Sequence, residues 1–251
     1  MQYTSLGNTG LTVSVAGLGC GGNSRIGLGA GASTEESTLL REAFELGVTF
    51  FDTARTYGTE GLVGQAFTPS ERDRIVLCTK SLVARGNERL SAAEVVANLE
   101  ASLADLRTDR IDVFLLHGVD PEHYDHACEQ LKPALLREQA KGKIRCLGLS
   151  ETAPRDPGRK MLQRALDDAT WQVFMLAYHM LNQGPRHDLF PRTRAQGVGT
   201  LLMFVVRNIF SRPACWRARS ATWPPRARCR RRWPTPTSHW PFWYTRAARR
   251  A

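Results

Sequence analysis

Seven short apolar runs alternate with segments of helical periodicity along this chain, and this alternation restricts its fold more than any other feature. We predict strands at VSVAGLG (13–19), VTFFD (48–52), RIVLCTK (74–80), IDVFLLH (111–117), IRCLGLS (144–150), WQVFMLAY (171–178) and VGTLLMFVV (198–206). Strands that are uniformly apolar and separated by helices predict a parallel sheet covered by helices. Two architectures fit this pattern, an open doubly wound sheet and a closed (β/α)8 barrel.

Helices are expected between these strands, and a hairpin is expected ahead of them. The helical segments are residues 33–47, 60–67, 91–106, 128–140 and 159–169. The third begins with a capping box formed by Ser91 and Glu94, and the fourth ends at Gly142. The segment YTSLGNTGLTVS (3–14) has a Gly-Asn-Thr-Gly turn between two alternating runs. It predicts a β-hairpin, which in a barrel could plug one end.

Four polar residues occupy equivalent positions, each at the carboxyl end of a predicted strand. They are Asp52, Lys80, His117 and Ser150, from the second to the fifth strand. In a barrel the carboxyl ends of the strands converge on one face, where such folds carry their chemistry. One polar residue at a strand end is typical of a satisfied cap, whereas four in succession indicate a shared site.

Tyr57 lies five residues after Asp52 and adds a proton donor to this set. A phenol with a pKa of about 10 is a poor acid at neutral pH, and a neighbouring ammonium would lower that pKa. A carboxylate keeps the ammonium charged, and an imidazole can donate a hydrogen bond to a substrate oxygen. Asp52, Tyr57, Lys80 and His117 would thus protonate an alkoxide as it forms. The set holds no nucleophile or metal ligand cluster, so hydride from a nicotinamide cofactor is the expected electron source.

The stretches FFDTARTYG (50–58), VLCTK (76–80), FLLHG (114–118) and GKIRCLGLSE (142–151) resemble the aldo-keto reductase family. The resemblance covers residues 1–206 and implies a (β/α)8 barrel that reduces an aldehyde or ketone with NADPH. It implies that Tyr57 is the general acid, that Lys80 and Asp52 tune it, and that His117 orients the carbonyl.

The same resemblance implies contacts to the cofactor. Ser150 would hold the nicotinamide carboxamide. Its neighbour, often asparagine in the family, is Glu151 here; Met175 replaces the glutamine of the sixth strand, and Met203 replaces the stacking aromatic of the seventh. A thioether can still pack against a flat ring. No segment matches the loop that grips the adenosine phosphate, so NADH remains an alternative to NADPH.

Two other motifs compete with this interpretation. Gly17, Gly19 and Gly22 form the G-x-G-x-x-G pattern of an open dinucleotide-binding sheet. That pattern requires a helix after the third glycine and an acid about 20 residues on, and the sequence supplies neither. His123 and His126, with Cys128 nearby, have metal-like spacing. Three ligands at these positions would not share one helical face, so we expect a solvated helix start and no bound metal.

The last 45 residues have a different composition from the rest. Of the 34 lysines and arginines, 12 are arginines within residues 207–251, which hold no acid, so 22 basic and 24 acidic groups remain in residues 1–206. The segment also contains five of the six tryptophans and six of the 13 prolines. Arginine with tryptophan could serve a nucleic-acid arm or a membrane surface, but the segment has no helical period. We expect it to be disordered and to bind neither.

Arg, Pro, Ala and Trp are the residues that G- and C-rich DNA encodes when it is read out of frame. We therefore hypothesise that the reading frame shifts shortly after Arg212, which sequencing of the locus would test. Seven strands end by Val206, whereas a barrel needs eight, so we expect an incomplete barrel. The alternative to a reductase is then an inactive barrel remnant or a non-catalytic binding or regulatory protein.

The remaining composition predicts a soluble, cytoplasmic protein. The longest apolar run, residues 201–206, is too short to cross a bilayer, and the first ten residues lack a signal-peptide pattern. Six cysteines have no metal-like spacing, and several lie in apolar runs, so we expect reduced thiols. The substrate is expected to be a small carbonyl compound, and the sequence is silent on oligomeric state.

Overall fold

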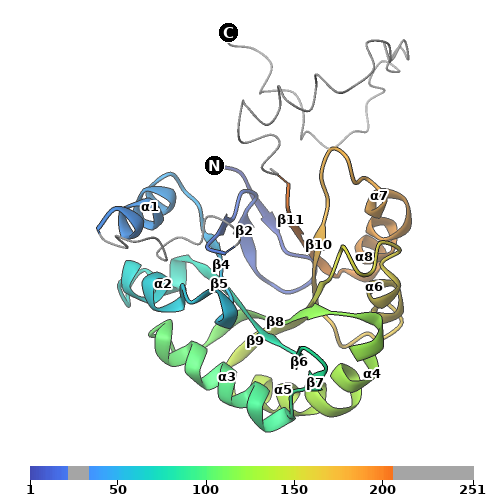
Figure 1. Cartoon of the computed structure of the whole chain (residues 1–251). Helices are drawn as coiled ribbons and strands as arrows, with labels where there is room; N and C mark the ends of the chain where they lie inside the picture. The colour runs from blue at the N-terminus through green and yellow to red at the C-terminus, as the bar shows by residue number, and fades with distance from the viewer. Residues whose placement is uncertain (22–33, 206–251) are drawn as a thin grey trace, which may run out of the picture. The chain divides into compact units, whose positions relative to one another are not determined.

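The computed structural model describes residues 1–21 and 34–205, with side chains from residue 38 in the second range. Seven strands form one sheet in which every neighbouring pair is parallel (Figure 1). Their order across the sheet is β11-β10-β9-β8-β5-β4-β3. The strands are β3 (Leu18–Gly19), β4 (Phe50–Asp52), β5 (Val76–Leu82), β8 (Ile111–Val119), β9 (Ile144–Glu151), β10 (Val173–Ala177) and β11 (Gly199–Met203).

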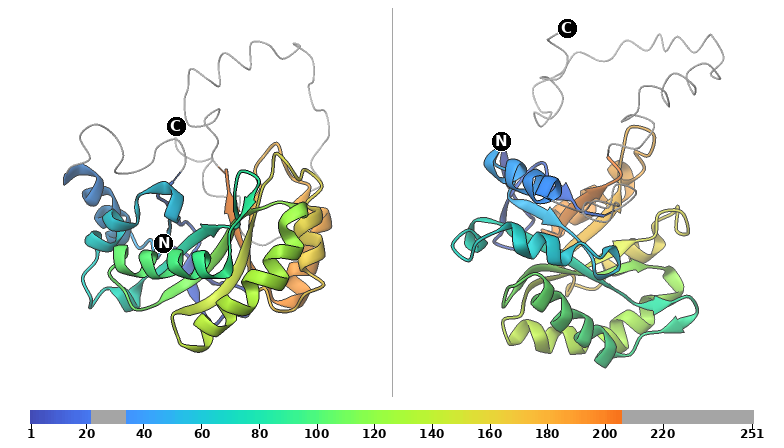
Figure 2. Two further views of the ribbon diagram at one scale, coloured as in Figure 1. Left: turned by 60° about the horizontal axis from the view of Figure 1, so that its bottom comes forward. Right: turned by 60° about the vertical axis from the view of Figure 1, so that its left-hand side comes forward.

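Helices cover the outer side of this curled sheet, as Figure 2 shows from two further directions. They are α1 (Thr34–Glu45), α2 (Glu60–Ala66), α3 (Ala92–Asp105), α4 (Tyr124–His126), α5 (Lys132–Ala140), α6 (Lys160–Ala165), α7 (Pro185–Asp188) and α8 (Phe190–Gln196). Single turns of tighter helix form η1 (Arg55–Tyr57), η2 (Arg72–Arg74) and η3 (Pro121–His123), and a small hairpin joins β6 (Ala84–Arg85) to β7 (Glu88–Arg89). The described residues thus form an incomplete (β/α)8 barrel, as predicted. None of their helices is long and apolar enough to span a membrane.

The N-terminal hairpin is confirmed, but it takes part of the predicted first strand. β1 (Tyr3–Ser5) pairs in antiparallel fashion with β2 (Thr12–Ser14), and only Leu18–Gly19 joins the barrel sheet. Ser14 explains the division because its hydroxyl accepts hydrogen bonds from the backbone N–H groups of Thr49, at 2.9 Å, and Phe50, at 3.3 Å. A side chain that takes over backbone donors in this way replaces a strand ladder locally.

The sheet has two apolar faces, as expected for strands buried on both sides. The inner face packs against the hairpin in a cluster of Leu6, Leu11, Val13, Phe50, Val76, Cys78, Val113, Leu115, Cys146, Val173, Met175 and Leu201. The outer face packs against the helices through residues such as Phe51, Leu77, Phe114, Leu147 and Phe174. Leucines of the hairpin therefore fill one end of the barrel, and the polar strand ends are left at the other.

Of two helical predictions, one was fully confirmed and the other was only partly right. The capping box at the start of α3 is present, since Glu94 N–H donates to Ser91 Oγ at 3.3 Å and Ser91 N–H donates to Glu94 Oε2 at 2.8 Å. The helix predicted over residues 128–140 begins earlier, with α4, and passes through a π turn, η4 (Ala127–Leu131), before α5. Pro133 in the first turn of α5 cannot donate to the carbonyl four residues earlier, which favours this irregularity.

Candidate active site

A buried ion pair lies at the carboxyl end of the barrel, between adjacent strands. Lys80 on β5 is completely buried, and its Nζ donates to Asp52 Oδ1 at 2.6 Å and to the Thr53 carbonyl at 2.7 Å. Burial is the largest single influence and disfavours the charged ammonium, but the Asp52 carboxylate, together with Cys78 and Tyr57, raises the pKa of Lys80 above its usual value overall. This pairing favours the ammonium form of the lysine.

Strand alternation explains why the two charges face each other. Phe50 and Cys78 belong to the inner apolar cluster, and Asp52 and Lys80 follow them at a spacing of two residues. Side chains two positions apart lie on the same face of a strand. The pair therefore continues the inner face of the barrel at its polar end.

Tyr57 is brought to this pair by the single turn η1, which follows β4 and ends at Gly58. Gly58 has a φ of 72°, in the left-handed region that glycine adopts without strain. The Lys80 ammonium lies 5.1 Å from the centroid of the Tyr57 ring. Phenol, ammonium and carboxylate thus meet, although they come from three different elements.

The pKa of Tyr57 differs in direction from the sequence-based expectation. Burial is the largest influence and raises the pKa of the phenol above its usual value, and the Asp52 carboxylate adds to this effect. Lys80 lowers the pKa, as expected, but by less than burial raises it. The phenol therefore stays protonated at neutral pH, which is the state that a proton donor requires.

His117 on β8 completes the group. Its ring packs edge-on against Tyr57, with 5.5 Å between centroids and 86° between planes. Burial, aided by the Lys80 ammonium, lowers the pKa of His117 to about 4, so the imidazole is neutral. Its Nδ1 is buried and meets no hydrogen-bond partner among the described residues. A β-bulge between Leu116 and Val119 shifts the strand register beside it.

Sequence reasoning missed Gly21 and Thr53. A Cβ atom on Gly21 would lie 2.2 Å from Cε2 of Tyr57, so the backbone of the loop after β3 packs directly against the phenol ring. Thr53 contributes only a carbonyl oxygen, to Lys80. No sequence signal marks a backbone acceptor, and Gly21 was hidden within a glycine-rich stretch.

The predicted cofactor residues lie on two different faces of the sheet. Ser150 on β9 and Met175 on β10 are register partners, and both are buried. Met175 belongs to the inner cluster, and the half-buried Met203 at the end of β11 packs against that cluster. Ser150 comes four positions after Cys146, which faces inward, so its side chain lies on the same face of β9. These three residues lie on the same inner face as Lys80.

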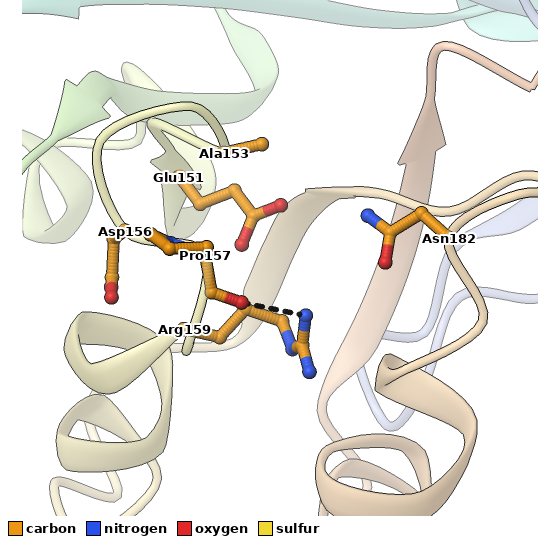
Figure 3. Close-up of a pocket in the computed structure, with 6 residues that line it drawn as sticks. All are labelled: Glu151, Ala153, Asp156, Pro157, Arg159 and Asn182. Atoms are coloured by element: carbon orange, nitrogen blue, oxygen red, sulfur yellow. Dashed lines mark hydrogen bonds between the residues drawn. The ribbon is translucent and has the colours of Figure 1, made fainter.

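Glu151 is separated from them because it follows Ser150 and so takes the opposite side of β9. Its Oε1 accepts a hydrogen bond from the Ala177 N–H at 2.7 Å, and Asn182 Nδ2 donates to the Ala177 carbonyl at 3.3 Å. Figure 3 shows Glu151, Arg159 and Asn182 around a cavity of about 180 Å³. Burial raises the pKa of Glu151 to about 7. The structure therefore does not bring Glu151 together with Ser150, Met175 and Met203.

The described cysteines are free thiols, as predicted. They are Cys20, Cys78, Cys128 and Cys146. Burial is the main cause that raises the pKa of each. Cys215 and Cys229 lie outside the described residues. A protonated thiol is a poor nucleophile, so the raised pKa values leave none of these four cysteines activated as a reacting group.

Comparison with known proteins identifies the family. The sequence model of the aldo/keto reductase family matches residues 18–212 of this chain. The chain belongs to the aldo/keto reductase family. This aldo/keto reductase chain is 28% identical over 208 residues to L-galactose dehydrogenase of Arabidopsis thaliana, which is 80% of this chain and 64% of that protein.

Solved structures agree with this assignment. An aldo-keto reductase of Bacillus halodurans, in its holo form, matches with a TM-score of 0.67 and 27% identity, covering 80% of this chain and 65% of that one. An aldo/keto reductase of Klebsiella pneumoniae in complex with NADP and acetate matches with a TM-score of 0.66 and 26% identity, covering 81% and 68%. The aldo/keto reductase chain spans less than two thirds of the length of L-galactose dehydrogenase.

The family assignment confirms the resemblance drawn from four motifs and excludes the open dinucleotide-binding sheet. Gly17 and Gly19 accompany the first barrel strand, whereas Gly22 lies outside the described residues. The family match ends at residue 212, close to where the arginine-rich composition begins. The predicted disorder of residues 207–251 also concerns residues outside the described part.

Proposed function

We propose that this aldo/keto reductase chain reduces an aldehyde or ketone to an alcohol, with NADPH as the hydride source and NADH as the alternative. The observation that carries the proposal is the packing of a protonated phenol between a buried ammonium and a neutral imidazole. Lys80 Nζ lies 5.1 Å from the Tyr57 ring centroid, and the His117 ring lies 5.5 Å from it on an edge-on approach.

The proton chemistry follows from these three groups. Tyr57 is the general acid that gives its hydroxyl proton to the oxygen of the forming alkoxide. Lys80 stabilises the phenolate that this leaves, because its positive charge is fixed by Asp52 2.6 Å away. His117 is neutral, so it orients the carbonyl oxygen by donating a hydrogen bond and does not compete as an acid.

We propose that a nicotinamide ring lies against the inner face beside these groups. Ser150 offers a hydroxyl for a carboxamide, and Met175 and Met203 offer soft apolar surface for a flat ring. When bound, the cofactor supplies the hydride that the carbonyl carbon receives. The binding of NADP by the Klebsiella pneumoniae relative supports this assignment. Glu151 lies on the other side of β9, so we propose for it an indirect role, through Ala177, in holding β9 and β10 together.

A non-catalytic role is the second candidate. Its support is that the chain spans 64% of L-galactose dehydrogenase and that seven strands form the sheet of the described residues. A strand without a neighbour exposes backbone donors and acceptors, and the loops of an eighth unit would be needed for a full cofactor site. In that case the residues of the acid site persist without turnover.

The Tyr57→Phe variant tests the proposal. NADPH binding is measured by fluorescence titration, and turnover is measured with a panel of small aldehydes and ketones by the loss of cofactor absorbance. General acid catalysis contributes about 10²–10⁴ in rate, so kcat is expected to fall by that factor while NADPH affinity is kept. Tyr3→Phe is the matched control, because Tyr3 is exposed on the hairpin and donates only to the Gly47 carbonyl.

Two results would contradict the proposal. Turnover by Tyr57→Phe at the parental rate would remove Tyr57 from the chemistry. Absence of both NADPH binding and turnover in the parent chain would favour the non-catalytic alternative.

A further inference from the structure

Three potential metal ligands gather in the loop that follows β8. Asp120, Glu122 and His123 each offer one ligand atom, and these atoms all lie within 4.8 Å of one another. Asp120 precedes η3, and Glu122 and His123 belong to it. Among the described residues, this is the one group of three or more such side chains that could hold an ion.

Asp120 carries an unused acceptor at this place. The residue is 4% exposed, and its Oδ1 is buried without a hydrogen-bond partner in the described part of the chain. Its Oδ2 lies 3.9 Å from His123 Nδ1. A buried carboxylate oxygen without a donor is costly, and a cation is one of the few partners that removes this cost.

The turn holds two of the ligands in place before any ion arrives. His123 N–H donates to the Asp120 carbonyl at 3.0 Å, and Pro121 fixes the backbone between them. Ligands on one tetrahedral zinc ion lie about 3.3 Å apart, given metal–ligand distances of about 2.0–2.1 Å. The distance of 3.9 Å between Asp120 Oδ2 and His123 Nδ1 is within 0.6 Å of this separation. Glu122 is exposed, so its carboxylate can move toward the other two ligands.

We propose that Asp120, Glu122 and His123 bind a divalent transition-metal ion, with Zn²⁺ as the best match to one imidazole and two carboxylates. Water would complete the coordination. Calcium and magnesium prefer oxygen alone, so the imidazole favours zinc, cobalt or nickel. Metal binding here is distinct from the proton chemistry of Tyr57 and does not depend on the proposed function.

Arg155 competes with the ion for the Asp120 carboxylate. Its guanidinium lies 3.0 Å from Asp120 Oδ2, but its side chain is 67% exposed. Only the arginine end of this ion pair is exposed, and solvent around the guanidinium weakens the pair relative to a fully buried one, so an ion at Asp120 can displace it. Arg89 approaches the carbonyl of Glu122 and not its carboxylate, which leaves the carboxylate available.

This set differs from the histidine motif that the sequence suggested. His126 is bound elsewhere, with its Nε2 2.8 Å from the Leu90 carbonyl. Cys128 lies 3.9 Å from Asp168. His123 turns instead toward the two acids that precede it in the chain. We expected no bound metal after weighing His123 together with His126 and Cys128, and that comparison did not include Asp120 and Glu122.

Calorimetric titration of the full chain with Zn²⁺, after dialysis against a chelator, tests the proposal. Asp120→Asn and His123→Gln are each expected to weaken binding at least tenfold. Arg155→Gln is expected to tighten it by up to about fivefold, since the competing ion pair is gone. Asp125→Asn is the matched control, because this exposed acid in the next turn pairs with Arg164 and should leave the affinity unchanged.

Titration with Co²⁺ identifies the ligand type. Imidazole and carboxylate ligands give weak visible bands, whereas cysteine thiolates add an intense charge-transfer band in the near ultraviolet. Circular dichroism of each variant confirms that the fold is kept. The proposal is overturned by no heat of binding at millimolar Zn²⁺, by equal affinity in the parent and the Asp120 and His123 variants, or by a thiolate band.

Discussion

Replacing Asp52 with asparagine tests the ion pair on which the acid site depends. Lys80 is fully buried, so Asp52→Asn leaves an ammonium that, among the described residues, keeps the Thr53 carbonyl as its charge-free acceptor. Breaking a buried pair in this way costs about 3–5 kcal/mol. Because the Asp52 side chain is 17% exposed and water can reach the site, we expect about 3 kcal/mol of lost stability.

Removing the lysine instead should cost less. Lys80→Met keeps the volume of the side chain and leaves Asp52 with its access to water, so we expect a loss of about 1–2 kcal/mol. The double variant has neither buried charge, and it should be more stable than Asp52→Asn alone. The order of stabilities therefore separates the loss of charge balance from a general loss of packing.

Urea unfolding monitored by circular dichroism measures these differences, and thermal melts repeat them. For a domain of this size, about 3 kcal/mol corresponds to a fall of about 6–12 °C in Tm. The reasoning would be refuted if Asp52→Asn stayed within about 0.5 kcal/mol of the parent, or if the double variant were less stable than either single one.

Three further perturbations have expected outcomes. Glu151 has a pKa of about 7 in the folded chain and a lower one in the unfolded chain, so its ionisation costs stability increasingly as pH rises from about 4.5 to 7. Glu151→Gln should remove up to about 3 kcal/mol of this loss, and equal urea midpoints for the variant and the parent at pH 8 would contradict it. Gly148→Ala places a Cβ atom 2.0 Å from the Val173 carbonyl, so a drop in Tm of at least several degrees is expected, and a parental melt would count against it. Gly21→Ala should push the Tyr57 ring aside and lower kcat with an unchanged far-ultraviolet spectrum; parental kcat would show that the ring position is not set there.

Much of the barrel could be predicted because its strands carry a local signal. Six of the seven apolar runs became single strands at nearly the predicted places, and the capping box of α3 formed as written in Ser91 and Glu94. The first run was divided because Ser14 bonds to Thr49 and Phe50, more than 30 positions away. A long-range side-chain contact of this kind leaves no trace in local periodicity.

The acid site was predictable for a geometric reason. Asp52 ends β4, whereas Lys80 and His117 lie two residues before the ends of β5 and β8, because both strands run two residues beyond their predicted ends; the carboxyl ends of these neighbouring parallel strands still meet. The cofactor side was less predictable because adjacent residues of a strand face opposite ways. Ser150 and Glu151 are neighbours in sequence, yet Glu151 bonds to the Ala177 backbone and lines a separate cavity.

The sheet order also separates the two halves of the proposed reaction. Asp52, Lys80 and His117 lie on β4, β5 and β8, which are consecutive neighbours in the sheet, and Tyr57 follows β4 directly. The proposed proton donor is thus assembled on β4, β5 and β8, with the loop after β3 packed against the Tyr57 ring, and it does not need β11. Ser150, Met175 and Met203 lie on β9, β10 and β11, toward the other edge. A defect near that edge should therefore weaken cofactor binding before it weakens proton transfer, and turnover should recover as the NADPH concentration is raised.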